Sequence, residues 1–309
     1  MSPNQPGILA SQMLELFMSV AVAALLAAIW QHYRYWRIRR DRAQDRQAIL
    51  HSAEVFHVIV FFRLRHGDKL VETCQRFNRQ ILSVTSARLI YAGQSAFTEN
   101  SHQLGSRDWD GVLLFEYPSR PDFEHSRMAP ETGAARALFA ESYIHGMRRN
   151  RRRSASVPLY MLRRRLLDTL TGHWHPEPLQ PSPEFATSPE YAVWRARVSR
   201  LRALHEINRH GAVVFNLVKY DTGRSSGMGT HNTDTLLSRM AALDHGPLHI
   251  GRCVALEEFA RFDRVYITFY PSARYLADLL SSQYFLAMTG QSRIADIVRV
   301  PTVPITYRL

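Results

Sequence analysis

From about residue 57 onward, short runs of β-branched and aromatic residues alternate with segments rich in glycine, proline and polar residues. Such runs are typical of strands that bury at least one face. In the C-terminal part of the chain they predict strands at residues 212–220, 248–256, 264–270 and 294–303. Apolar positions at helical spacing predict a helix over residues 233–244, and Ser272 is placed to begin a helix that runs to about residue 288.

The same blocks occur in the same order in the first half of the chain. HVIVFFRLR at residues 57–65 corresponds to AVVFNLVKY at residues 212–220. LIYAGQ and PLHIGR then share a glycine, Gly93 in one and Gly251 in the other. WDGVLLFEYPS at residues 109–119 corresponds to FDRVYITFYPS at residues 262–272, with the aspartate, valine and Tyr-Pro-Ser positions identical. We interpret this as one module used twice.

Each copy has the order β-α-β-β-α-β, which is the ferredoxin-like arrangement with helices on one face of an antiparallel sheet. The bare sheet face of each copy needs a partner of the same shape. The predicted fold class is therefore α+β, with two modules packed sheet to sheet as an α/β barrel within one chain, behind an N-terminal helix. In the first copy Pro121, Pro130 and Gly133 predict that the second helix is interrupted or shifted.

These features divide the chain into six predicted parts. They are a short tail (1–7), a transmembrane helix (8–30), a basic juxtamembrane segment (31–54), a first module (55–147), a basic and proline-rich linker with helices (148–210) and a second module (211–309). Within the linker, residues 191–209 have the apolar spacing of an amphipathic helix.

Residues 8–30 form an apolar run of 23 residues in which Glu15 is the only charge. A helix of this length is about 35 Å long, enough to cross a hydrocarbon core of about 30 Å. A cleaved signal peptide is the alternative, but residues 1–7 contain no lysine or arginine. We therefore expect an uncleaved anchor in the lipid bilayer.

An aromatic and arginine-rich segment follows this run. Its arginines are expected to contact anionic lipid head groups at the membrane surface: Arg34, Arg37, Arg39, Arg40 and Arg42. Cations on the C-terminal side alone predict that the globular part lies in the cytoplasm, below a bacterial inner membrane. A second arginine-rich segment, residues 148–165, either lies on the same leaflet or packs on the barrel with a solvated arginine face.

Positive charge is concentrated in connecting segments. The chain has a net charge of +12, and only Lys69 and Lys219 are lysines. Residues 34–46, 148–165 and 195–209 together carry 19 arginines and three acidic residues, so the remainder of the chain is mildly acidic. Because no basic face is predicted on the modules themselves, nucleic-acid binding is disfavoured.

NLVKY (216–220), HGPLHIGR (245–252) and FDRVYITFYPSARYLADLLSSQYF (262–285) resemble the domain-of-unknown-function 1330 family, which belongs to the dimeric α/β-barrel superfamily. The resemblance covers residues 211–303 and, more weakly, residues 56–146. It implies that two ferredoxin-like modules form a barrel, usually from two chains. Related barrels include cofactor-independent monooxygenases and isomerases acting on apolar or aromatic compounds.

Strand alternation suggests which side chains face the barrel interior. If the fully apolar face of each strand meets the helices, the mixed face lines the interior. The residues expected there, as candidate ligand contacts, are Asn216, His249, Tyr266, Thr268, Tyr270 and, from the first copy, Tyr117. Such an interior is either a small-ligand cleft or a filled core in which the tyrosine hydroxyls satisfy one another.

The sequence contains no phosphate-binding loop, dinucleotide glycine pattern, nucleophile elbow or zinc-protease motif. No catalytic residue, metal site or cofactor is predicted. The first functional hypothesis is a membrane-anchored barrel that binds a small apolar or aromatic ligand or a protein partner. The alternative is a cofactor-independent monooxygenase or isomerase-like enzyme acting on a lipophilic molecule. The oligomeric state is left open.

Overall fold

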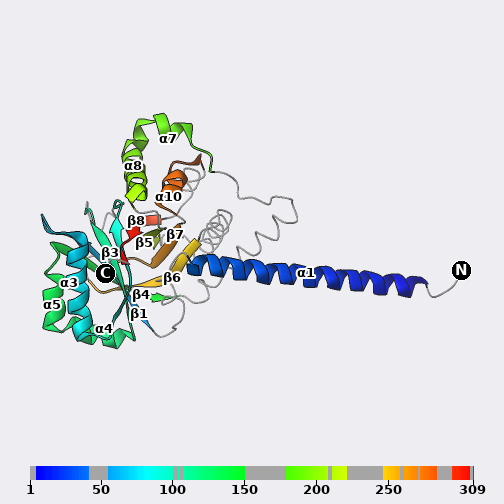
Figure 1. Ribbon diagram of the computed structural model, residues 1–309, viewed down its shortest axis with the longest axis horizontal. Helices are drawn as coiled ribbons and strands as arrows, with labels where there is room; N and C mark the ends of the chain where they lie inside the picture. The colour runs from blue at the N-terminus through cyan, green and yellow to red at the C-terminus, as the bar shows by residue number, and fades with distance from the viewer. Residues whose placement is uncertain are drawn as a thin grey trace.

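The computed structural model describes residues 5–41, 55–99, 104, 107–149, 179–207, 211–220, 246–257, 261–270, 272–283, 294–306 and 309. Its strands form one closed antiparallel barrel in the order β1-β3-β2-β8-β5-β7-β6-β4 (Figure 1). The strands are β1 (Phe56–Arg63), β2 (Arg88–Ser95), β3 (Gly111–Tyr117), β4 (Glu141–Arg149), β5 (Ala212–Tyr220), β6 (Gly246–Ala255), β7 (Arg264–Tyr270) and β8 (Ile294–Pro304). The predicted α+β barrel within one chain is therefore observed.

The two halves of the barrel have the same strand order. The first half runs β4-β1-β3-β2 and the second runs β8-β5-β7-β6. Two seams join them. At one, β2 pairs with β8 and places Ser95 opposite Thr302; at the other, β4 pairs with β6 and places Met147 opposite Cys253. Hydrogen bonding at both seams leaves neither half with a free sheet edge.

Helices lie outside the barrel in two groups (Figure 1). The first group is α3 (Leu70–Val84), α4 (Arg120–Arg127) and α5 (Pro130–Arg136). The second is α7 (Pro183–Thr187), the 3-10 helix η2 (Pro189–Tyr191), α8 (Ala192–Ile207) and α10 (Ala273–Leu280). The break between α4 and α5 confirms the predicted interruption, because Pro130 cannot continue the preceding helix. The helix predicted over residues 233–244 lies outside the described residues.

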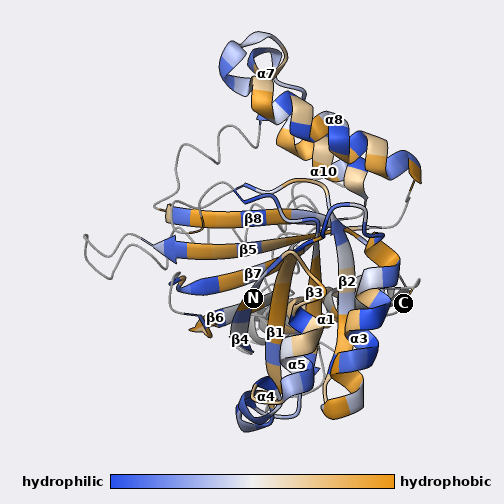
Figure 2. Ribbon diagram, turned by 90° about the vertical axis from the view of Figure 1, so that its left-hand side faces the viewer, coloured by the Kyte–Doolittle hydropathy of each residue, from blue (hydrophilic) through white to orange (hydrophobic). Residues whose placement is uncertain are grey.

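The barrel interior is an apolar cluster that takes side chains from both halves. Its members include Ile59 and Phe61 of β1, together with Phe215 of β5. Phe61 and Phe215 meet edge to face, with ring centroids 6.5 Å apart. Separate clusters lie outside the sheet, one under α3 to α5 and one under α8 and α10. Figure 2 shows β1 and β5 largely in the colour of apolar residues, whereas α3 and α8 carry both kinds of residue.

The predicted facing of the strands is wrong in both halves. The fully apolar sets lie inside the barrel, and the sets expected inside lie outside. The interior positions are Val112, Leu114, Val213, Phe215, Leu217, Val265, Ile267 and Phe269. A closed barrel excludes water from its interior and therefore takes the wholly apolar face. The described helices cover the outer face only in part, and polar residues occur there.

The repeated aspartate has the same structural role in both halves. The Asp110 carboxylate accepts a hydrogen bond from the Leu64 backbone N–H at 2.7 Å, and the Asp263 carboxylate accepts one from the Tyr220 N–H at 2.8 Å. The repeated serine also has one role in both halves: Ser119 caps the N-terminus of α4 and Ser272 caps that of α10. The shared string therefore fixes a strand end and a helix start.

The repeated glycines lie at the two seams. Gly93 pairs with Pro304 and Gly251 pairs with Arg149. A Cβ atom on Gly93 would lie 2.6 Å from the Tyr91 hydroxyl and 2.8 Å from Thr302 Cβ. A Cβ on Gly251 would collide with the side chain of Met147. Glycine is favoured at these positions because the side chains of Tyr91 and Met147 lie directly above the backbone.

The N-terminal helix α1 (Gln5–Asp41) projects away from the barrel (Figure 1). Its large apolar side chains are exposed, with Phe17 at 70% and Leu25 at 61%. Within the described residues, no helix reaches the combination of length and hydropathy that a membrane crossing needs. The predicted transmembrane character of residues 8–30 is therefore not supported, although these residues are helical as expected. Of the arginines expected at the membrane surface, Arg34, Arg37, Arg39 and Arg40 fall within α1, and Arg42 lies outside the described residues.

Candidate functional site

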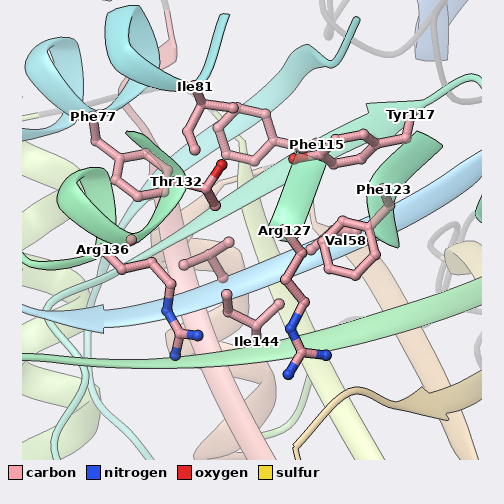
Figure 3. A pocket seen from close by; sticks show the side chains of 12 residues that line it. Val58, Phe77, Ile81, Phe115, Tyr117, Phe123, Arg127, Thr132, Arg136 and Ile144 are labelled. Atoms are coloured by element: carbon pink, nitrogen blue, oxygen red, sulfur yellow. The ribbon is translucent and has the colours of Figure 1, made fainter. Parts of the chain in front are cut away.

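A cavity lies between the outer face of the first sheet and the helices that cover it. Its volume is about 120 Å³. It is lined by Val58, Val60, Phe77, Ile81, Phe115, Tyr117, Phe123, Arg127, Thr132, Gly133, Arg136 and Ile144 (Figure 3). We call it the sheet–helix cavity.

The floor of the sheet–helix cavity is set by strand register. Val58 lies opposite Phe115 across β1 and β3, and Val60 lies opposite Ile144 across β1 and β4. Opposite residues of paired strands point to the same face, so these four side chains form one apolar surface. All four are buried.

Aromatic rings form the walls. Phe77 of α3 lies with its ring centroid 5.9 Å from that of Phe115. Phe123 of α4 meets Tyr117 edge to face at 5.2 Å. These contacts fix the distance between the helices and the sheet, and therefore the width of the cavity.

The break between α4 and α5 leaves room for the cavity. The Thr132 hydroxyl donates to the Ser126 carbonyl at 2.7 Å and fastens the two short helices together. Gly133 faces open space, because a Cβ atom added there would meet nothing within 4 Å. Thr132 and Gly133 of α5 therefore line the cavity beside Arg127 of α4.

Two arginines define one edge of the cavity. Figure 3 shows the guanidinium groups of Arg127 and Arg136 pointing to the same edge, with Ile144 between them. Arg136 donates to the Glu257 carboxylate at 2.7 Å and to the Ser142 hydroxyl at 3.3 Å. Glu257 follows β6, so this ion pair links the cavity to the second half of the chain.

Tyr117 is the residue of the predicted candidate set that lines the cavity. It does so from outside the barrel, whereas an interior position was expected. Burial raises the pKa of its phenol to about 12. Near neutral pH it is therefore an uncharged hydroxyl that can take part in hydrogen bonds but cannot serve as a base.

Asn216, Tyr266, Thr268 and Tyr270 are not brought to this cavity. Asn216 accepts from Arg299 Nε at 3.2 Å and donates to the Tyr266 carbonyl at 3.3 Å. The hydroxyl groups of Tyr266 and Tyr220 share a hydrogen bond of 2.6 Å outside the barrel. Thr268 is buried on the same outer face.

Tyr270 and His249 complete the predicted set. Tyr270 packs against the cluster under α8 and α10, and burial raises the pKa of its phenol to about 12 although Arg299 opposes the shift. The backbone of His249 pairs with Ile267 in the β6–β7 ladder, and its side chain lies outside the described part of the structure.

Titratable groups do occur inside the barrel, on β4. The Tyr143 hydroxyl and His145 Nδ1 are 3.1 Å apart, and both residues are buried. Burial lowers the pKa of His145 to about 4 and raises that of Tyr143. The imidazole is therefore neutral near pH 7, and the surrounding apolar cluster leaves this pair enclosed by core side chains.

Most of the cavity lies outside the residues predicted from the sequence. Phe77, Phe123, Arg127 and Arg136 lie on helices that were predicted as elements of the repeat, whereas the predicted ligand contacts all lie on strands. The available signal was the interruption at Pro130, which marks where the helical cover of the first sheet differs from that of a regular module.

No model of a known protein family matches the chain, and no curated protein matches it significantly. Solved structures with a similar fold include a protein from Fusobacterium nucleatum assigned as a monooxygenase (8% identity, TM-score 0.42, covering 83% of this chain and 94% of that chain). Chlorite dismutase from Candidatus Nitrospira defluvii is another (7% identity, TM-score 0.39, covering 85% and 97%). A dimeric protein of unknown function with a ferredoxin-like fold, from Bacteroides fragilis, covers 30% of this chain and 93% of its own (18% identity, TM-score 0.20). These likenesses concern the fold, and membership of the domain-of-unknown-function 1330 family stays a prediction.

Proposed function

We propose that the chain binds one small, largely apolar molecule in the sheet–helix cavity. The observation that carries the proposal is the cavity itself, which has a volume of about 120 Å³ and a predominantly apolar lining. An apolar cavity of about 150 Å³ in another protein accepts benzene. The expected ligand therefore has an apolar part about the size of a single aromatic ring or a short branched acyl chain.

The lining favours binding over catalysis. Tyr117 is held as a neutral phenol, and the arginines Arg127 and Arg136 are cations that do not act as bases. The alternative, a cofactor-independent monooxygenase or isomerase, remains a prediction from the family resemblance. Turnover by an enzyme of this kind would need a base or an activated substrate that these groups do not themselves supply.

Titration of the purified full chain with toluene, followed by calorimetry, tests the proposal. Saturable binding of one toluene molecule is expected. Val60→Phe places a ring on the cavity floor and is expected to abolish binding without loss of the folded state, which thermal unfolding checks. Phe77→Leu enlarges the cavity and is expected to shift the preference towards propylbenzene. Toluene affinity that neither substitution changes would reject this site.

We also propose that α1 attaches the chain to a lipid bilayer. What supports this is the exposure of apolar side chains all round the helix, including the consecutive residues Leu16, Phe17 and Met18 at 55–70%. A large exposed apolar surface of this kind is typical of a membrane or protein contact. The full chain is expected in the membrane fraction, resistant to alkaline extraction, and the double variant Leu25→Arg and Leu26→Arg in the supernatant. A full chain that is released from the membranes by alkaline extraction, or never found with them, would contradict the proposal.

A further inference from the structure

The charge along the edge of the sheet–helix cavity identifies the chemical class of its ligand. Of the twelve described residues that line the cavity, two are arginine and none is acidic. An apolar cavity that binds only hydrocarbons has no need of cations at its edge. The inference below rests on the proposed function, because it concerns the occupant of the same cavity.

One of the two positive charges is already neutralised. Arg136 is ion-paired with Glu257, whose side chain is only 12% exposed. Among the residues that the structure describes, Arg127 has no carboxylate within ion-pairing distance. Within the described part of the structure, the edge therefore carries one uncompensated positive charge, that of Arg127, beside an apolar wall.

A guanidinium group recognises planar carboxylates through two parallel hydrogen bonds. A carboxylate has one negative charge near neutral pH, which matches the single charge left by the Arg136–Glu257 pair. A phosphate monoester carries about −1.5 to −2 and would leave excess negative charge at this edge. The charge balance therefore favours a carboxylate over a phosphate.

We infer that the cavity binds a small aromatic or branched aliphatic monocarboxylate. The apolar part occupies the space between β1, β3, β4 and the helices, and the carboxylate lies at the edge, where Arg127 binds it. The Arg136–Glu257 pair stays intact when the ligand binds. The negative charge of Glu257 lowers the positive potential at this edge and so limits the affinity for a carboxylate.

Glu257→Gln tests the inference, because the expected change is a gain in carboxylate affinity and not a loss. The amide keeps an oxygen that can accept from the Ile144 N–H, which lies 3.4 Å from the Glu257 carboxylate. It removes the negative charge that neutralises Arg136. Glu257→Gln is therefore expected to raise affinity for a carboxylate several-fold, whereas a purely structural role of Glu257 would lower affinity or leave it unchanged.

The experiment compares benzoate, toluene and phenyl phosphate by calorimetry on the full chain, with the detergent blank subtracted. Benzoate is expected to bind at least tenfold more tightly than toluene. Arg127→Gln is expected to remove that difference and to leave toluene affinity unchanged. The matched control is Arg120→Gln, because Arg120 is on the same helix, pairs with Glu124 at 3.3 Å and does not line the cavity. This control is expected to bind benzoate as the parent chain does.

Each result has a defined meaning. If benzoate and toluene bind equally well and Arg127→Gln changes neither affinity, the carboxylate inference is overturned while the proposed function stands. If phenyl phosphate binds more tightly than benzoate, the inference is overturned in favour of a phosphate. If none of the three binds, the proposed function fails and the inference fails with it.

Discussion

Asp110 and Asp263 accept the same hydrogen bond in the two halves of the chain. The Asp110 carboxylate accepts a hydrogen bond from the N–H of Leu64, just after β1, at 2.7 Å. The Asp263 carboxylate accepts one from the N–H of Tyr220, at the end of β5, at 2.8 Å. The backbone N–H of each aspartate donates in turn to that strand, at Phe62 O and Val218 O. The two halves therefore close the same corner of the fold with the same residue.

Removing either aspartate should destabilise the barrel. A hydrogen bond to a charged group contributes about 1.5–3 kcal/mol when it is shielded from water. The bond of Asp110 is partly buried and that of Asp263 is exposed. Asp110→Ala is expected to lower the free energy of unfolding by about 2 kcal/mol and Asp263→Ala by about half as much. Urea unfolding measures both, and the exposed Asp108 is the control, with Asp108→Ala expected to be neutral.

The seam glycines should differ in their tolerance of a methyl group. At Gly93 the obstacle includes Thr302 Cβ, which cannot move without the β8 backbone. At Gly251 the obstacle is mainly the flexible side chain of Met147. Gly93→Ala is expected to cost more than 2 kcal/mol of unfolding free energy and Gly251→Ala about 1 kcal/mol. An equal loss of unfolding free energy in the two variants would contradict this and show that the two seams are packed alike.

At Gly133, in contrast, an alanine should stabilise the protein. It lies within α5, and an added Cβ would meet nothing within 4 Å. Alanine in place of glycine inside a helix stabilises by about 0.5–1 kcal/mol. Gly133→Ala is therefore expected to raise the melting temperature by a few degrees. A lower melting temperature would show that the backbone at this position needs a conformation that alanine avoids.

Acid should destabilise the barrel through its buried histidines. Burial lowers the pKa of His57 and His145 from 6.5 to about 4, and for His57 the Arg149 guanidinium adds to the shift. Between pH 6.5 and 4 the unfolded chain binds protons that the folded chain does not. The free energy of unfolding should therefore fall as pH is lowered through this range.

The contribution of one histidine can be isolated. Each proton taken up only by the unfolded chain gives a slope of about 1.4 kcal/mol per pH unit. Urea unfolding between pH 7 and 4.5 is expected to show a slope lower by up to this amount in His145→Gln than in the parent chain. An unchanged slope would mean that His145 titrates in the folded state as it does in the unfolded chain.

Much of the fold could be predicted from the sequence because local patterns determine it. The predicted strand limits of β5 and β7 are confirmed, at Ala212–Tyr220 and Arg264–Tyr270. The break before Pro130 and the helix start at Ser272 are confirmed as well, since ring geometry and hydroxyl capping act within a few residues. These features do not depend on the remainder of the chain.

The facing of the strands could not be obtained in the same way. The apolar face of each strand was expected to meet the helices, whereas Val213, Phe215 and Leu217 show that it fills the barrel. Alternation along a strand separates the two faces but does not say which one is enclosed. Which face meets the interior depends on closure of the barrel at both seams, and that is a property of the whole chain.

The cavity was missed for a related reason. Its volume results from how far Phe77 and Phe123 hold two helices above the sheet, and no local pattern records that distance. Tyr117 entered the candidate set through an incorrect facing and nevertheless lines the cavity. The interior candidates Asn216 and Tyr266 were instead found to be bonded to neighbours on the outer face.

The proposed ligand binds outside the first sheet and not within the barrel. Methyl resonances recorded by nuclear magnetic resonance during toluene titration distinguish these two places. Saturable shifts are expected at Val58, Val60, Ile81 and Ile144, with the interior methyl groups of Val213, Leu217, Val265 and Val300 unchanged. Shifts confined to the interior set, or absent from both sets, would contradict it.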